Sequence, residues 1–523
     1  MFSPQDSMLN QRCSGILLHP TSLPSRYGIG DLGEGAFQFI DFLADSDQSI
    51  WQILPLGPTG YGNSPYLCYS ALAINPWLIS PEKLVEVGLL FADSLDHAPE
   101  FNTPYVDYDA AIAYKSQLLK QAFASFTSRP DPDLTQAFDD FCEAQADWLT
   151  DYALFMALKE AHGGAGWHTW DKAIAWREPE ALATWSQRLK TEILYHQFVQ
   201  FIGFRQWQAV KQYANQRHVA IFGDLPIYVA HDSADVWANP ENFCLDPETG
   251  AAAMMAGVPP DYFSETGQLW GNPVYNWETL QSTDFAWWVN RFKALLQYLD
   301  IVRVDHFRGF ESYWGVPEGE TTAQYGDWYP APGREFFQVL RERLGDNLPI
   351  VAEDLGVITP EVEALRDDFG FPGMKILHFA FDSDRANVFL PFNYTNRNAI
   401  VYTGTHDNDT TVGWFDGRSP EQQQTVINYL GCVCSEGIQW SLIRLASSSV
   451  ANVAIFPLQD ILGLGNDARM NLPGTAEGNW GWRYHPDQLT PGLAGHLSFI
   501  TEMYGRRIYH PEPQPSPPSA EED

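Results

Sequence analysis

The chain has 523 residues, of which 45% are hydrophobic and 19% are charged, so it is long enough to bury a large core. Its 66 acidic and 31 basic residues give a net charge of −35. Such a charge disfavours nucleic acid, anionic membranes and polyphosphates as partners and favours a neutral substrate.

Six cysteines without zinc-type spacing, no secretory signal at the N-terminus and no apolar run of about 18 residues predict a cytoplasmic, reduced protein without a membrane span. The closest approach to a metal motif is Cys432-x-Cys434. We interpret it as structural because no second pair and no His accompany it.

Eight short apolar segments predict β-strands, and helical patterns separate most of them. They are 14–20, 49–56, 219–224, 301–307, 349–355, 374–380, 400–407 and 450–456. Eight strands alternating with helices is the count of an α/β (β/α)8 TIM barrel. The segment from Pro457 onward shows helical and loop signals, so no C-terminal β-sandwich domain is expected.

Helix signals and loop composition divide the remainder of the chain. We expect six segments: 1–76 with barrel strands 1–2, 77–200 as a mainly helical insertion, 201–231 with strand 3, 232–285 as a substrate-binding loop insertion, 286–510 with strands 4–8, and 511–523 as a Pro-rich, acidic, disordered tail. Helix starts are predicted at Ser80-Pro81-Glu82, at Thr359-Pro360-Glu361 and at the capping box Ser419-Pro420-Glu421-Gln422.

Carboxylates stand at the ends of four predicted strands: Asp224, Asp305, Glu353 with Asp354, and Asp407. The C-terminal ends of barrel strands open on one face, so these acids should converge. Arg303 and Asp305 share one strand face because side chains alternate. The alternative is that Asp305 caps a helix or pairs with Arg308.

Paired carboxylates around an acetal carbon are the apparatus of glycosyl transfer. Arg303 would keep Asp305 ionised and nucleophilic, because a nearby cation favours the charged form. The apolar neighbours Val351 and Leu355 would raise the pKa of Glu353 and suit it to acid/base work. A divalent-metal site is the alternative, but none of these strand ends carries the Lys that such sites often use.

Two loops combine aromatic and small polar residues, as sugar-binding sites do. The first, 57–66, holds Tyr61 and Ser64, and the second, 257–273, holds Tyr262, Phe263, Gln268 and Trp270. Ring faces can stack on sugars while amides bind hydroxyls. A packed Ω-loop is the alternative for Tyr262 or Phe263.

These stretches together resemble the 4-α-glucanotransferases (amylomaltase or disproportionating enzyme) of glycoside hydrolase family 77. The resemblance covers about residues 12 to 510. It rests on 54–60 (LPLGPTG), 223–228 (GDLPIY), 257–273, 303–310 (RVDHFRGF), 352–356 (AEDLG), 404–408 (GTHDN), 473–475 (PGT) and Asn479-Trp480.

The resemblance implies a retaining double displacement on α-1,4-glucans without a metal or organic cofactor. It implies Asp305 as nucleophile, Glu353 as general acid/base and Asp407 as the residue that holds the hydroxyls of the reacting sugar. It also implies substrate-binding roles, which we assign to Arg303, His406, Asp224, Tyr61, Ser64, Tyr262, Phe263, Gln268, Trp270 and Asn479. The implied partners are a glucan donor and a glucose or maltooligosaccharide acceptor.

The sequence departs from the family at Asn63, Leu67, Cys68 and Ile74, which we expect to touch the rim loop and acceptor binding. Two other functions stay open. An α-amylase-type hydrolase would use similar acids but would normally add a β-sandwich. An inactive glucan-binding protein would be expected to lack one of Asp305, Glu353 and Asp407.

Overall fold

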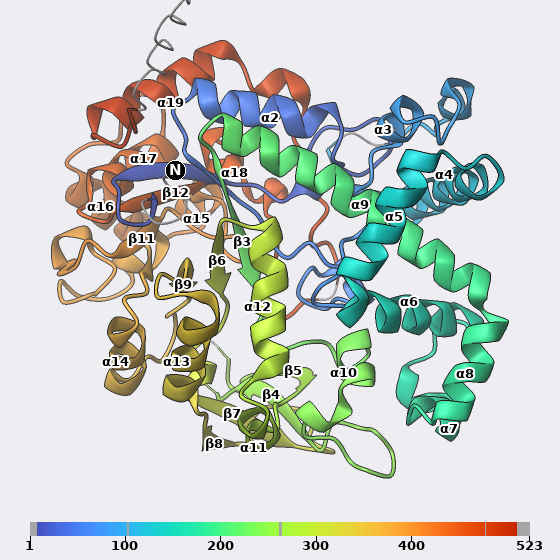
Figure 1. Ribbon diagram of the computed structural model, residues 1–523. Helices are drawn as coiled ribbons and strands as arrows, with labels where there is room; N and C mark the ends of the chain where they lie inside the picture. Colours follow the sequence, from blue (N-terminus) through green and yellow to red (C-terminus); the bar gives the residue numbers. More distant parts are fainter. Residues whose placement is uncertain (1–7, 102–103, 261–263, 476, 510–523) are drawn as a thin grey trace, which may run out of the picture.

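Eight parallel strands form the central barrel of the computed structural model, which describes residues 8–101, 104–260, 264–475 and 477–509 (Figure 1). They are β1 (Cys13–Leu17), β2 (Ile50–Gln52), β3 (Ala220–Leu225), β6 (Ile301–Val304), β9 (Ile350–Ala352), β10 (Gly373–Ile376), β11 (Ala399–Tyr402) and β12 (Val453–Pro457). Their order is β10-β11-β12-β1-β2-β3-β6-β9. The amide of Ala352 donates to the carbonyl of Pro372 at 2.9 Å and joins β9 to the β10 side. All eight predicted strands, and with them the (β/α)8 fold, are confirmed.

The barrel interior changes character along its axis. Its lower part is filled by apolar side chains such as Ile50, Ile301 and Ile400, each at most 1% exposed. Towards the C-terminal end the inward-facing positions become polar, with Arg303 only 5% exposed. The interior therefore passes directly from a packed core into the region where the strand ends carry their acids.

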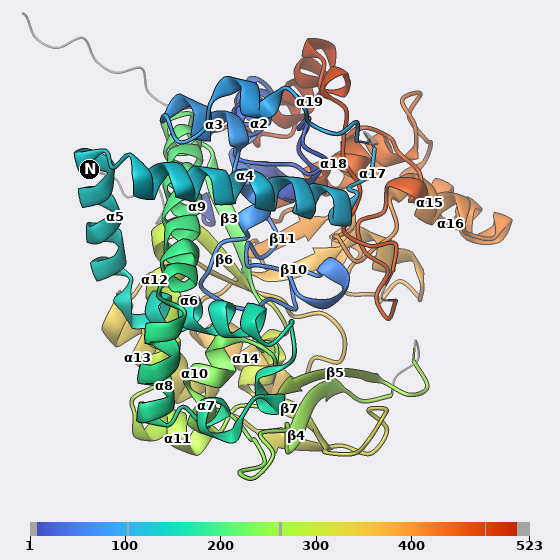
Figure 2. The same ribbon diagram turned by 90° about the vertical axis from the view of Figure 1, so that its right-hand side faces the viewer.

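Helices cover the barrel and form a separate layer beside it (Figures 1 and 2). They are α2 (Glu34–Asp45), α3 (Pro81–Glu86), α4 (Tyr108–Ser128), α5 (Pro132–Ala144), α6 (Ala146–Ala161), α7 (Lys172–Ala175), α8 (Pro179–Arg188), α9 (Lys190–Gln216), α10 (Ala234–Ala238), α11 (Trp277–Ser282), α12 (Ala286–Tyr298), α13 (Gly333–Leu344), α14 (Pro360–Asp368), α15 (Thr411–Asp416), α16 (Pro420–Leu430), α17 (Ile438–Ser448), α18 (Leu458–Ile461) and α19 (Pro491–Met503). Among the residues that the structure describes, no helix is both long enough and apolar enough to cross a membrane.

The three predicted helix starts agree with the structure. Helices α3 and α14 begin at Pro81 and Pro360, and the Ser419–Gln422 capping box is formed at α16. The long helix α9 packs against α4, α5 and α6 on one side and against α2 and β3 on the other. The segment boundary drawn at 200/201 therefore falls inside one continuous helix.

A second sheet, which sequence patterns did not predict, lies beyond the C-terminal ends of β3 and β6 (Figure 1). Its strands are antiparallel, in the order β5 (Gln268–Pro273), β4 (Met254–Val258), β7 (Ser312–Pro317) and β8 (Asp327–Pro330). The region 257–273, expected to be a loop, is thus largely a hairpin. The tail 511–523 lies outside the described residues.

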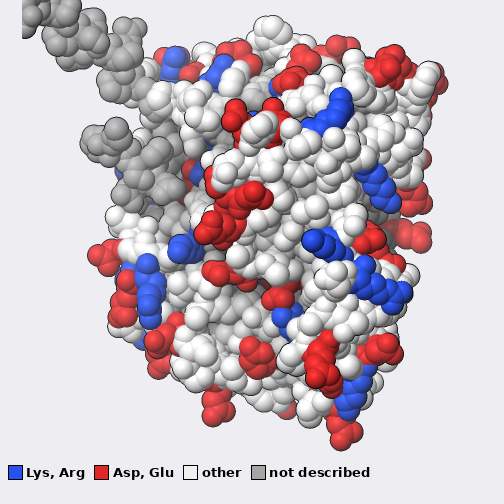
Figure 3. Space-filling view, turned by 45° about the vertical axis from the view of Figure 1, so that its right-hand side comes forward, with Lys and Arg blue, Asp and Glu red and all other residues white. Residues whose placement is uncertain are grey.

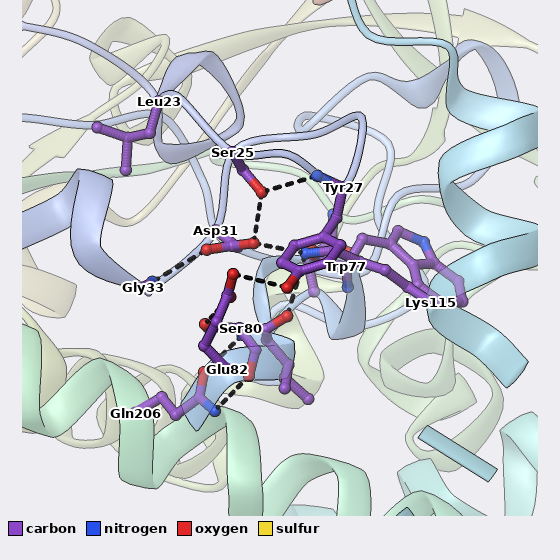
Figure 4. A network of polar contacts seen from close by, with 12 residues as sticks. Leu23, Ser25, Tyr27, Asp31, Gly33, Trp77, Ser80, Glu82, Lys115 and Gln206 are labelled. Carbon is purple, nitrogen blue, oxygen red and sulfur yellow. Dashed lines mark hydrogen bonds and ion pairs between the residues drawn. The ribbon is translucent and has the colours of Figure 1, made fainter. Parts of the chain in front are cut away.

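A buried ion pair ties the helical layer to the barrel (Figure 4). Lys115 on α4 donates to Asp31 Oδ2 at 3.1 Å and to the carbonyl of Trp77 at 2.8 Å. Asp31 also accepts the Ser25 hydroxyl at 2.8 Å and the Gly33 amide at 3.0 Å. The Lys115 and Asp31 side chains are only 1% and 5% exposed. Each charge is therefore satisfied by the other and by neighbouring polar groups.

We predict that Lys115→Met destabilises the protein by about 3–5 kcal/mol, because the substitution leaves Asp31 buried without its counter-charge. Urea denaturation of the purified protein measures the change. The matched control is Lys83→Met, whose partner Glu86 is 58% exposed, and for which we expect about 0–1 kcal/mol. Equal losses in the two variants would contradict the assignment, and Lys115→Met/Asp31→Asn should recover part of the loss.

Candidate active site

One arginine joins the acids of two neighbouring barrel strands. Arg303 Nη1 lies 2.6 Å from Asp224 Oδ2, and Arg303 Nη2 lies 2.8 Å from Asp305 Oδ1. The register of β3 with β6 places Asp224 directly opposite Arg303. Asp305 follows the last residue of β6, and its side chain is 30% exposed, against 1% for Asp224. Asp305 is thus the carboxylate of this trio that a substrate can reach.

Asp224 is held from a second direction by Tyr66. The Tyr66 hydroxyl donates to Asp224 Oδ2 at 2.7 Å, and its ring stacks on His406 with 5.3 Å between centroids. Burial raises the pKa of Asp224, while the guanidinium of Arg303 opposes that shift. Tyr66 therefore connects the β3 end of the site with the β11 end.

Glu353, which follows β9, is oriented by two backbone amides. Its Oε2 accepts the amide of His306 at 2.7 Å, and its Oε1 accepts the amide of Leu355 at 3.0 Å. Burial raises the pKa of Glu353 to about 8, against the opposing effect of Arg303. The sequence-based expectation of a protonated Glu353 next to an ion-paired Asp305 agrees with this arrangement.

The amide that reaches Glu353 comes from a residue in an unusual backbone conformation. His306 has φ 51° and ψ 50°, in the left-handed region. A residue other than Gly, Asn or Asp pays an energetic cost there, and such strain concentrates at functional sites. Because Asp305 directly precedes His306, this turn links the two carboxylates through one backbone amide.

Asp407 lies beyond β11 and is held by its own set of neighbours. Asn471 donates to Asp407 Oδ1 at 2.7 Å, and His406 Nε2 lies 3.3 Å from the same oxygen. Arg469 donates to the Asp407 carbonyl at 2.6 Å. The Asp407 side chain is 43% exposed and so remains available to a ligand.

The aromatic candidates divide into described and undescribed residues. Trp270 on β5 meets the His306 ring edge-on, with 4.9 Å between centroids, and its Nε1 donates to Gln268 Oε1 at 3.3 Å. Trp270 and Gln268 are therefore placed beside the turn that follows Asp305 and contacts Glu353. Tyr262 and Phe263 lie outside the described residues, as does the side chain of Tyr61.

The side chains of two predicted binding residues, Asn479 and Ser64, form hydrogen bonds with nearby backbone groups. The side-chain Oδ1 of Asn479 accepts the backbone amide of Leu472 at 2.9 Å, and its Nδ2 donates to the backbone carbonyl of Thr475 at 2.9 Å. These bonds tie Asn479 to its own segment of the chain. Ser64 Oγ accepts the backbone amide of Tyr66 at 3.3 Å. The structure brings Ser64 next to Tyr66 in the rim loop, whereas the Asn479 side chain is already paired.

The alternative pairing of Asp305 with Arg308 is wrong. Arg308 donates to the carbonyl of Val357 and stacks on Trp328, while Asp305 pairs with Arg303. Among the described residues, no group of three His, Cys, Asp or Glu side chains is arranged to hold a metal ion.

One of the four departures does not lie on the rim. Ile74 is 2% exposed, and a Cβ added to Gly203 on α9 would stand 2.5 Å from Ile74 Cγ2. Ile74 therefore packs against a glycine of the helix layer, which corrects the expectation that it bears on acceptor binding. Asn63 has φ 55°, a left-handed conformation that Asn tolerates.

Sequence reasoning missed three contributors: Tyr66, Asn471 and Trp480. Tyr66 was visible as the second tyrosine of the 57–66 loop, but nothing distinguished it from Tyr61. Trp480 lies 6.0 Å from His406 and 5.9 Å from Tyr66, ring centre to ring centre. Asn471 comes from an irregular segment whose residue pattern carries no signal for its contact.

The amino-acid sequence matches a protein family and several of its members along most of its length. Residues 18–490 match the protein family described as 4-alpha-glucanotransferase. A 4-alpha-glucanotransferase of Synechocystis sp. is 80% identical, over 96% of this chain and 100% of the relative. One from Thermus thermophilus is 49% identical, over 95% of this chain and 99% of the relative.

A solved structure agrees with both the fold and the sequence match. The amylomaltase of Streptococcus agalactiae, in complex with acarbose, superposes with a TM-score of 0.92 at 41% identity, covering 95% of this chain and 100% of that one. From these similarities and the matched residues, we conclude that the chain belongs to the 4-alpha-glucanotransferase family, glycoside hydrolase family 77.

Proposed function

We propose that this enzyme moves a segment of an α-1,4-glucan to the 4-hydroxyl of glucose or a maltooligosaccharide by a retaining double displacement. The observation that carries the mechanism is the contrast between two linked carboxyl groups. Asp305 is partly exposed and paired with a guanidinium, whereas burial raises the pKa of Glu353 to about 8. One group is thus suited to attack carbon and the other to deliver a proton.

In the first step, the Asp305 carboxylate attacks the anomeric carbon and forms an ester with the glucosyl unit. The protonated Glu353 gives its proton to the oxygen of the leaving glucan, so the bond breaks without releasing an alkoxide. In the second step, the Glu353 carboxylate takes the proton of the acceptor 4-hydroxyl. That oxygen then attacks the anomeric carbon and frees Asp305.

The remaining polar groups are proposed to hold the sugar. Asp407 and His406 would bind its hydroxyls from the β11 end, and Asp224 with Arg303 from the β3 end. Tyr61, Ser64, Tyr262, Phe263, Gln268, Trp270 and Asn479 are the proposed lining of the glucan path. On the face shown in Figure 3, acidic side chains are interspersed with fewer basic ones, which agrees with a neutral substrate.

The products formed from maltotriose distinguish transfer from hydrolysis. We predict that the purified protein converts it to glucose and longer maltooligosaccharides while the total number of reducing ends stays constant, because each transfer replaces one bond with another. Chromatography and a reducing-end assay measure both quantities. A rise in reducing ends would favour the α-amylase-type hydrolase, and no reaction would favour the inactive glucan-binding protein.

Asp305→Asn should fold normally and lose activity by on the order of 10⁴-fold or more, because an amide cannot form the ester. Circular dichroism checks the fold, and the same maltotriose assay checks turnover. Activity close to that of the unmodified protein would show that the nucleophile is misassigned.

The pH dependence of activity should follow the titration of Glu353. The group must carry its proton in the first step, so activity is expected below its raised pKa and should be lost as the pH rises through about 8. The dependence of kcat/KM on pH, with maltotriose as substrate, measures this limb. Loss of activity already at about pH 4–5, where an ordinary glutamate titrates, would contradict the assignment.

The left-handed backbone conformation of His306 should affect activity because it positions the amide that contacts Glu353. His306→Asn and His306→Gly tolerate this conformation, whereas His306→Val resists it because of its branched Cβ. The valine variant should lose the amide contact with Glu353, lower kcat on the order of tenfold or more, and move the alkaline limb to higher pH.

The asparagine variant is the matched control, because it also lacks the imidazole that meets Trp270. It should keep the alkaline limb of the unmodified protein even where its KM changes. If the valine and asparagine variants showed the same kcat and the same pH profile, the backbone conformation would have no positioning role.

A further inference from the structure

An indole on the second sheet lies open beside the site without a role in the mechanism. Trp328 on β8 is 39% exposed, and the guanidinium carbon of Arg308 stands 3.8 Å from the centre of its ring. Trp314, its cross-strand partner on β7, meets it edge-on with 5.3 Å between centroids. The indole is thus fixed by two neighbours while part of its surface faces solvent. Fixed aromatic surfaces of this kind stack well on flat, neutral ligands.

Arg308 links this indole to both catalytic loops. It lies three residues after Asp305 along the chain, and its guanidinium also donates to the carbonyl of Val357. Val357 follows Glu353 by four residues and is 62% exposed. The Trp328 ring and the Val357 backbone therefore share one partner, Arg308, beside the loop that follows Glu353.

The two proposed chemical steps indicate whether the donor or the acceptor glucan would lie beside Trp328. The acid/base group works on the leaving oxygen and then on the acceptor hydroxyl, so the side of the cleft with Glu353 is the acceptor side. Asp407, His406 and Tyr66 form a separate group around the β11 end. The loop that follows Glu353 instead contacts Arg308, the residue that stacks on Trp328.

We propose that Trp328, backed by Arg308 and flanked by Val357, is a further acceptor-side subsite that stacks on a glucose unit of an α-1,4-linked maltooligosaccharide. The unit it binds lies beyond the ring whose 4-hydroxyl reacts, because Trp328 reaches the catalytic loops only through the length of the Arg308 side chain. This subsite rests on the proposed transferase function. Its consequence is a preference for long acceptors over glucose.

The test compares acceptors of two lengths. Maltotriose serves as donor, with radiolabelled glucose or radiolabelled maltopentaose as acceptor, and KM is measured for each acceptor. Trp328→Ala should raise KM for maltopentaose by about fivefold, the equivalent of about 1 kcal/mol of stacking, and leave KM for glucose unchanged. Trp328→Phe, which keeps a ring, should stay closer to the unmodified protein.

Tyr325→Ala is the matched control, because Tyr325 is 69% exposed on the connection that leads into β8, and among the described residues no guanidinium stacks on its ring. It should change KM for neither acceptor. The subsite would be refuted if Trp328→Ala left both KM values unchanged or impaired both acceptors equally. The unmodified protein distinguishes these outcomes from a failure of the proposed function, which would appear as no transfer from maltotriose at all.

Discussion

The site depends on one buried guanidinium that two carboxylates share. Arg303 sits inside the barrel, 5% exposed, where an unpaired charge would cost several kcal/mol. Asp224 and Asp305 satisfy it from neighbouring strand ends. Removing Arg303 would leave two neighbouring carboxylates without their shared counter-charge, whereas removing Asp305 would leave Arg303 paired with the buried Asp224. The parallel register of β3 with β6 therefore sets both the fold and the position of the proposed nucleophile.

The same region gives two carboxyl groups different surroundings. Asp305 has a guanidinium at 2.8 Å, and its side chain is 30% exposed, so a ligand can reach it. Glu353 is half-buried and accepts two backbone amides, and desolvation raises its pKa to about 8. The His306 amide, which directly follows Asp305 in the chain, therefore helps to position Glu353 relative to Asp305.

The barrel and its acids could be predicted because their signals are local. Each strand is a short, mainly apolar run, and each acid lies at the end of such a run or within a few residues after it. The second sheet could not be predicted in the same way, since its strands are partly exposed and include polar residues, as in β5 (QLWGNP) and β8 (DWYP). Asn471 and Tyr66 act through contacts between distant segments, and Ile74 was misplaced because its partner Gly203 is far away in the chain. Contacts of this kind leave no periodic pattern in the sequence.

In the proposed mechanism, hydrolysis and transfer use the same two carboxyl groups, so the acids at the strand ends alone do not decide between them. The difference arises in the second step, when either water or a sugar hydroxyl meets Glu353. A sugar gains an advantage only from groups that bind it outside the reacting bond, and two of the aromatic groups proposed for this role lie on the second sheet. The second sheet contributes Trp270 beside His306, and Trp328 beside Arg308. Because Arg308 also donates to the carbonyl of Val357, one side chain contacts both the proposed acceptor surface and the loop that follows the proposed acid/base group.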